Sequence, residues 1–166
     1  NALDYYADAL RISEEIDTKS ETPNILINTG DVNYKLNKYK LALKFYTEAK
    51  QISLETENKN TLCEAYLGIA KSYESQNEHQ IALSNALEAK KISEEIGLLE
   101  HQKQASEILS KIYKATGNYK DALENQETFK RLNDSLFNKK NIEKIAQLEY
   151  EYKYKQALDF ASIREL

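Results

Sequence analysis

Proline and glycine, which interrupt strands and form turns, are scarce in this sequence: it has one proline and four glycines among 166 residues. Folds built from short strands usually need many more turn residues than this. Residues that favour helices, such as Ala, Leu, Glu, Lys and Gln, are common instead. The composition therefore predicts an all-α protein.

Further absences restrict the function. The 23 basic residues are outnumbered by 27 acidic ones, so the chain lacks the basic excess typical of nucleic-acid binding. Cys63 has no partner for an internal disulfide, and we expect it to be a small residue packed in a helix. No apolar run is long enough to cross a membrane, and no signal peptide is present. The lack of methionine and the start at Asn1 favour an excised piece of a longer protein, with any membrane contact made elsewhere.

Catalytic and metal-binding patterns are also missing. The two histidines, His79 and His101, are 22 residues apart and do not form the i, i+4 pair of a zinc-binding helix. We expect His79 to pack where related segments carry a turn aromatic, and His101 to be exposed at the start of a helix. The chain has no glycine-rich phosphate loop and no nucleophile elbow. We therefore predict that this chain is not an enzyme and has no cofactor or metal site.

A repeat of 40 residues dominates the sequence. Four Ala-Leu pairs recur at this interval, and their first residues are Ala2, Ala42, Ala82 and Ala122. Another small residue precedes each of the last three pairs by twelve positions: Gly30, Ala70 and Ser110. Small residues at these offsets place one close-packed face on each of two helices per repeat. We expect helices at residues 2–17, 23–36, 39–57, 60–76, 79–96, 100–116, 119–134 and 138–163.

The repeat resembles the tetratricopeptide repeat, in a 40-residue variety, over residues 1–134. The positions that carry the resemblance are Tyr66, Ile69, Ala70, Tyr73, Ala82, Ala89, Leu109, Ser110, Tyr113, Gly117, Tyr119 and Ala122. Thr29 and Asn33 depart from the pattern, because those positions are usually apolar or aromatic. HEAT and armadillo repeats, which also run to about 40 residues, are the alternative.

The resemblance implies a right-handed solenoid of antiparallel helical hairpins over residues 1–137. Its parts would be a half repeat at 1–20 and hairpins at 22–58, 59–97 and 99–134. The first helix of each hairpin would line a concave surface that binds a protein or peptide. The residues implied for that surface are Asn24, Ile27, Asn28, Asp31, Tyr34, Lys35, Glu64, Leu67, Lys71, Glu74, Gln104, Glu107, Lys111 and Lys114. A solvated face without a ligand is the alternative, and Ile27 and Asp31 argue against the family's clamp for chaperone tails.

The last segment departs from the repeat. The stretch from Asp134 to Asn138 breaks the pattern, and we expect a separate long helix at 138–166. One apolar stripe is expected to cap the open end of the repeats: Ile142, Ile145, Leu148 and Tyr152. A second stripe, with heptad-like intervals, suits a connector or a homodimer: Tyr150, Tyr154, Ala157 and Ala161. The alternation of the three tyrosines is also compatible with a strand.

The junction between the repeats and this helix resembles that of bacterial tetratricopeptide sensor proteins. The segments that carry this resemblance are residues 134–138 and 144–151. It implies the sensor or adaptor region of a signal-transduction protein, such as a sensor histidine kinase or a transcriptional regulator. The region would be an extracytoplasmic part of a membrane-anchored protein. A soluble scaffold or a cytoplasmic peptide-pheromone receptor is the alternative.

Overall fold

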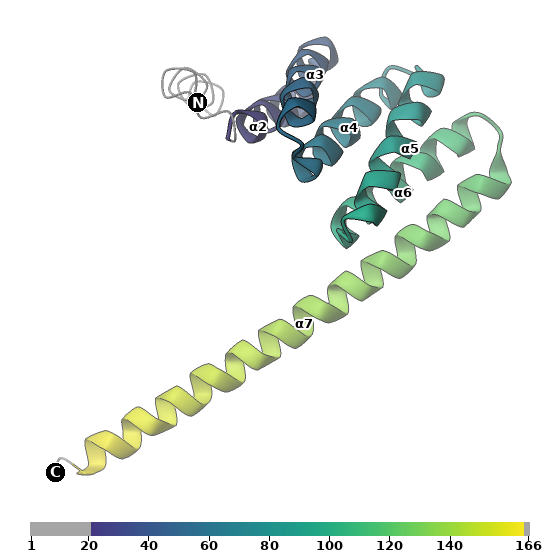
Figure 1. Ribbon diagram of the computed structural model, residues 1–166. Coiled ribbons are helices and arrows are strands. Elements are labelled where there is room, and N and C mark those ends of the chain that lie inside the picture. Colours follow the sequence, from purple (N-terminus) through teal and green to yellow (C-terminus); the bar gives the residue numbers. More distant parts are fainter. Residues whose placement is uncertain (1–20, 165–166) are drawn as a thin grey trace.

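The computed structural model describes the backbone of residues 21–164 and the side chains of residues 21–156. This part of the chain contains six helices and no strands, which confirms the all-α prediction. The helices are α2 (Thr22–Lys35), α3 (Tyr39–Glu55), α4 (Lys59–Glu74), α5 (His79–Glu95), α6 (Leu99–Ala115) and α7 (Tyr119–Arg164) (Figure 1). Five of the expected helices agree with these bounds to within two residues. The helix expected at 2–17 lies outside the described residues.

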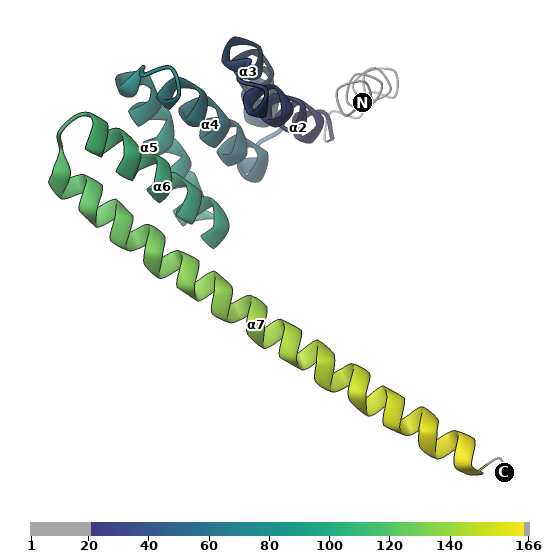
Figure 2. The ribbon, with the colours of Figure 1, turned by 180° about the vertical axis from the view of Figure 1, so that it is seen from behind.

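The helices form two layers. Each helix from α2 to α6 packs against the next one along the chain, and α4 also contacts both α2 and α6. In the described part of the chain, α3 and α5 do not contact each other. Helices α2, α4 and α6 therefore form one layer, and α3, α5 and the first part of α7 form the other (Figures 1 and 2). The exposed side of the first layer is called the α2–α4–α6 face below.

The turns between the helices repeat every 20 residues. The residues with positive φ in the described part of the chain are Asn37, Glu57, Asn77, Gly97 and Gly117. At the first of these turns, the Lys38 amide donates to the Asn33 carbonyl and the Asn37 amide to the Tyr34 carbonyl, both at 2.9 Å. This is the Schellman arrangement, and all five turns share it. Each 40-residue repeat therefore contains two similar helix–turn units.

Within residues 21–164, Glu57 is the one left-handed residue that is neither glycine nor asparagine, with φ of 53°. We expect Glu57→Gly to raise the free energy of unfolding by about 0.5–1 kcal/mol, because the relief of left-handed strain exceeds the entropy gained by the unfolded chain. Chemical denaturation measures the change. Asn77→Gly is the matched control and should be near neutral, since asparagine tolerates this conformation. A loss of stability in Glu57→Gly would show that this turn is not strained.

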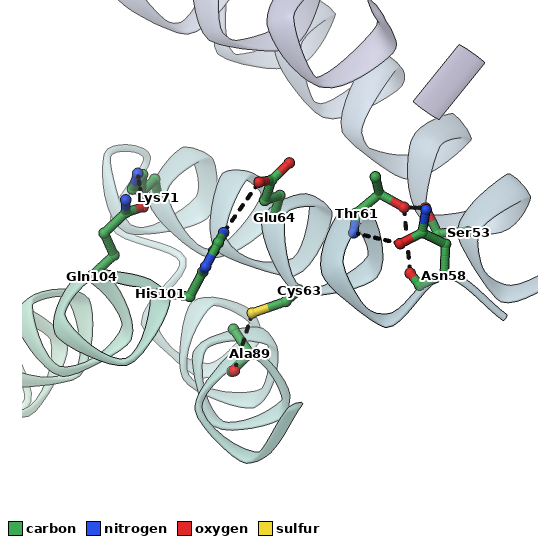
Figure 3. Close-up of polar contacts among 9 residues, drawn as sticks. All are labelled: Ser53, Asn58, Thr61, Cys63, Glu64, Lys71, Ala89, His101 and Gln104. Carbon is green, nitrogen blue, oxygen red and sulfur yellow. Dashed lines mark hydrogen bonds and ion pairs between the residues drawn. The ribbon is translucent and has the colours of Figure 1, made fainter. Parts of the chain in front are cut away.

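The side chains at the α3–α4 turn reinforce the start of α4. Asn58 caps this helix, and its side chain accepts a hydrogen bond from the Thr61 amide at 3.2 Å. The hydroxyls of Ser53 and Thr61 are 2.7 Å apart and are both buried (Figure 3). This buried pair joins the end of α3 to the beginning of α4.

The core confirms the close-packed positions of the repeat. Ala42 and Ala82 are fully buried, and Ala122 is 8% exposed. Two clusters of buried apolar residues share α4, one formed with α2 and α3 and the other with α5 and α6. Cys63 belongs to the second cluster and is fully buried, as expected.

Tyr46 is the largest side chain that is fully buried. Its ring lies against two helical glycines, Gly30 of α2 and Gly68 of α4. A Cβ atom added to either glycine would come within 2.6 Å of the Tyr46 Cε1 atom. The ring of α3 can therefore occupy the junction of three helices only because both neighbouring backbones lack a side chain at that point.

Thr29 and Asn33, the two residues of α2 that depart from the repeat pattern, form hydrogen bonds within their own helix. The Thr29 hydroxyl donates to the Ile25 carbonyl at 2.7 Å, and the Asn33 amide donates to the Thr29 carbonyl at 2.8 Å. Both side chains are buried. The preceding turn of the same helix thus supplies acceptors for both donors, whereas the buried Asn33 Oδ1 atom has no hydrogen-bond partner among the described residues.

The end of the chain differs from the expectation. Residues 119–164 form one continuous helix of 46 residues, so the predicted break at residues 134–138 is wrong. No glycine or proline occurs between Tyr119 and Arg164, and both Asp134 and Ser135 are exposed to solvent. Residues with a weak preference for turns do not end a helix that has no breaker. The strand considered for residues 150–154 is also wrong.

The capping role expected for the first apolar stripe of this segment is wrong as well. Ile142, Ile145, Leu148 and Tyr152 are each between 54% and 68% exposed. Only the first part of α7 lies along α6, and the rest extends beyond the other helices (Figures 1 and 2). The expectation failed because the unbroken helix carries these residues past the end of α6.

Candidate functional site

The α2–α4–α6 face contains a hollow with a volume of about 190 Å³. It is lined by residues of all three helices: Ile27, Asn28, Asp31, Glu64, Leu67, Gly68, Lys71, His101 and Gln104. On each helix these residues are separated by one, three or four positions, so they share one side of that helix. Figure 3 shows side chains of α4 and α6 meeting across this face, with Glu64 near His101 and Lys71 near Gln104.

The floor of the hollow is apolar and its walls are polar. Ile27 is 6% exposed and Leu67 is 2% exposed, whereas Asn28 and Asp31 are exposed. Gly68 is buried and lies against the Tyr46 ring. The lining is therefore mostly polar, with a small apolar floor, and it offers several hydrogen-bonding groups to a ligand.

The two carboxylates of the hollow each have a partner. The Tyr46 hydroxyl donates to Asp31 Oδ1 at 2.6 Å. Burial, followed by this contact with Asp31, raises the pKa of Tyr46 well above its ordinary value, so the hydroxyl keeps its proton. Glu64 Oε1 lies 3.1 Å from His101 Nε2 (Figure 3). Tyr46 of the core therefore positions the Asp31 carboxylate, and His101 of α6 positions the Glu64 carboxylate.

His101 is only partly exposed, so the expectation of an exposed histidine is wrong. Its side chain is 14% exposed because it reaches across to Glu64, which precedes it by 37 residues. The Nδ1 atom is buried and has no hydrogen-bond partner in the described part of the chain. His79, at the start of α5, is partly buried and also has an unpaired Nδ1 atom, which agrees with a packing position.

Lys71 is the lysine that lines the hollow. Its Nζ atom donates to Gln104 Oε1 at 3.2 Å, and it forms no ion pair within residues 21–156. Burial lowers the pKa of Lys71, with Asp31 and Glu107 acting in the opposite direction. A partly buried ammonium group with one neutral partner has hydrogen-bonding capacity for a further acceptor.

The structure brings seven of the fourteen residues expected on the concave surface into the hollow. The seven are Ile27, Asn28, Asp31, Glu64, Leu67, Lys71 and Gln104. The other seven do not line it: Asn24, Tyr34, Lys35, Glu74, Glu107, Lys111 and Lys114. Among these, Tyr34 contacts the Ser75 hydroxyl at 2.9 Å, and Lys111 pairs with Glu107 at 2.7 Å.

Sequence reasoning missed Gly68 and His101 as parts of this site. Gly68 follows Glu64 by four residues, and His101 precedes Gln104 by three. Both residues could have been assigned to this site from the sequence, because each lies three or four positions from a residue already assigned to the same face of its helix.

Other reactive groups do not form a site of their own. Burial is the main cause that raises the pKa of Cys63 to about 12, so the thiol is protonated at neutral pH. Its Sγ atom donates to the Ala89 carbonyl at 3.3 Å (Figure 3). Among the described residues, no cluster of three His, Cys, Asp or Glu side chains is arranged to hold a metal ion. None of the described helices is long and apolar enough to cross a membrane.

Comparison with known proteins does not assign the chain to a family. No protein-family model matches it, and no curated protein matches it.

Proposed function

We propose that the helices form a right-handed solenoid of the tetratricopeptide type, with the α2–α4–α6 face as its concave surface. Three observations support this proposal: the 40-residue sequence repeat, the shared turn geometry every 20 residues, and the two layers of helices. Proteins of this architecture stack similar units side by side and bind partners along the surface formed by one layer.

We propose further that this surface binds a peptide or a segment of a protein in the hollow. The observation that supports it most strongly is the partly buried Lys71, which donates to the neutral Gln104 and forms no ion pair within residues 21–156. A carboxylate of the ligand would accept hydrogen bonds from Lys71, and an apolar part of the same side chain would contact Ile27 and Leu67. The Asn28 side chain is exposed and forms no hydrogen bond in the described part of the chain, so its amide group can pair with a peptide backbone.

The long helix extends this proposal to a sensor or adaptor region. Helix α6 contributes His101 and Gln104 to the hollow and also packs against α7. A ligand in the hollow would therefore contact the helix on which α7 rests. We propose that the chain binds its partner on the concave surface and presents α7 to a further component of a signalling protein.

Loss of the Lys71 charge is expected to weaken peptide binding. Peptides would first be selected from a random display library on the full chain, and their affinity measured by titration calorimetry. Lys71→Gln should weaken the selected acidic peptides about ten- to a hundredfold, because a charge-assisted hydrogen bond is lost. Lys114→Gln is the matched control, since Lys114 is exposed and lies outside the hollow.

Two results would contradict the proposal. One is a selection that yields no peptide with measurable affinity. The other is an equal response to both substitutions, which would indicate a general effect of charge instead of a contact with Lys71.

A further inference from the structure

The outer part of α7 carries large apolar side chains that contact no other helix. In the described part of the chain, α6 is the only helix against which α7 packs. Every residue from 137 to 156 is exposed. Five large apolar side chains of this segment lie toward one side of the helix, and this set is called the outer stripe: Phe137, Ile142, Ile145, Leu148 and Tyr152. Apolar groups gathered in this way usually mark an interaction surface.

The outer stripe lies roughly opposite the side of α7 that packs on the rest of the protein. Ala122, Asn125 and Leu132 are the buried residues of α7 among those up to residue 156, whose side chains are described. At the angular step of an α-helix, Leu148 and Tyr152 lie on the far side from them. In Figures 1 and 2 the outer part of α7 extends away from the other helices, so a second long helix can lie along the outer stripe without meeting them.

Part of the outer stripe follows the spacing of a coiled coil. Ile145, Leu148 and Tyr152 occupy positions a, d and a of the heptad repeat. Phe137 and Ile142 lie at the flanking positions g and e, and the adjoining core positions hold Asn138, Asn141 and Lys155. Lys144 and Glu149 then occupy the flanking positions g and e. In two parallel helices in register, Lys144 of one copy approaches Glu149 of the other, and the reverse pair forms by symmetry.

The charges near the outer stripe are of both signs. The charged residues from 137 to 156 are Lys139, Lys140, Glu143, Lys144, Glu149, Glu151, Lys153 and Lys155. Five of them are basic and three are acidic, and the glutamates lie between lysines along the segment, so the surface carries no field of a single sign. Anionic membrane surfaces attract helices with a cationic polar face, which this segment lacks. A second copy of the same chain matches both the apolar spacing and the charges.

We propose that α7 pairs with α7 of a second copy through the outer stripe, as a parallel two-stranded coiled coil in register. The five side chains each expose about 100 Å², judged from their exposed fractions and from the size of such side chains. Pairing would bury on the order of 1,000 Å² in total, at the lower limit for a specific interface. The dimer is therefore weak, and it forms and dissociates with changes in concentration.

Sedimentation of the full chain tests this proposal. Wild-type protein should shift reversibly from monomer to dimer between low micromolar and low millimolar concentration. Tyr152→Lys, within the outer stripe, should leave the protein monomeric over the same range. Tyr150→Lys makes the same change two residues away, on the other side of the helix and in the second stripe that the sequence offers for a homodimer. It should leave the dissociation constant unchanged, and loss of the dimer in this variant would overturn pairing through the outer stripe. Circular dichroism would establish that both variants keep their helix content.

Charge exchange tests the register. Lys144→Glu should weaken the dimer severalfold through repulsion by Glu149 of the partner. The double variant Lys144→Glu with Glu149→Lys should restore the wild-type dissociation constant. A wild-type protein that stays monomeric, or a dimer that persists in Tyr152→Lys, would overturn the pairing proposed here. A double variant that stays weak would overturn the parallel register. None of these outcomes depends on peptide binding at Lys71, so the two proposals fail independently.

Discussion

Tyr46→Ala is expected to lower the free energy of unfolding by about 3–5 kcal/mol, as for other large aromatic side chains removed from a core. The ring is 1% exposed and lies between the backbones of α2 and α4 at Gly30 and Gly68. Neither glycine has a side chain that could move into the space, so most of the cavity would remain. Chemical denaturation of the two proteins measures the difference.

Tyr46→Phe separates the ring from its hydroxyl group. This variant keeps the packing and loses only the hydrogen bond to Asp31, and it should cost about 1 kcal/mol. Asp31 is exposed and can be hydrated in its place. If Tyr46→Phe lowered the free energy of unfolding as much as Tyr46→Ala, the hydroxyl and not the ring would be the main stabilising group.

Gly68→Ala is expected to destabilise the protein by about 1–2 kcal/mol, although alanine is the better helix former by about 1 kcal/mol. The added Cβ would lie 2.5 Å from Cε1 and 2.7 Å from Cζ of Tyr46. Contacts this short force the ring to move, and three helices meet around it. The cost of overpacking therefore exceeds the gain in helix propensity.

The same substitution should change sign when the ring is absent. In the Tyr46→Ala background, Gly68→Ala adds a methyl group to an empty space and should be neutral or stabilising. A double-mutant cycle from denaturation curves measures this coupling. An equal cost of Gly68→Ala in both backgrounds would mean that the glycine is needed for a reason other than the ring.

The repeat made the positions of the helices and of their small residues predictable. Ala42 and Ala82 recur at one interval, and the structure buries both completely. Local signals also placed the helix ends well, because the left-handed residues Asn37, Asn77, Gly97 and Gly117 are of the types that favour such turns. The sequence alone therefore predicted the helices, the turns and the small packing residues within one repeat.

Features that depend on contacts between helices were harder to predict from the sequence. Gly68 lies two residues before the repeated position of Ala70, so the 40-residue pattern does not mark it as a packing site. The ring that requires it comes from Tyr46, on another helix. His101 is partly buried through Glu64, its partner on α4. Such contacts depend on the distance between packed helices, which the pattern within one helix does not contain.

The continuity of α7 has a mechanical consequence. The segment beyond residue 137 extends for roughly 40 Å at the rise of an α-helix. Because the helix is unbroken from its first turn on α6, it behaves as a lever whose fulcrum is the α6–α7 contact. A tilt of about 5° at that contact would move the far end by roughly 3–4 Å, given this length. A shift in α6 too small to alter the hollow noticeably would therefore become a displacement of atomic size at the other end of the molecule.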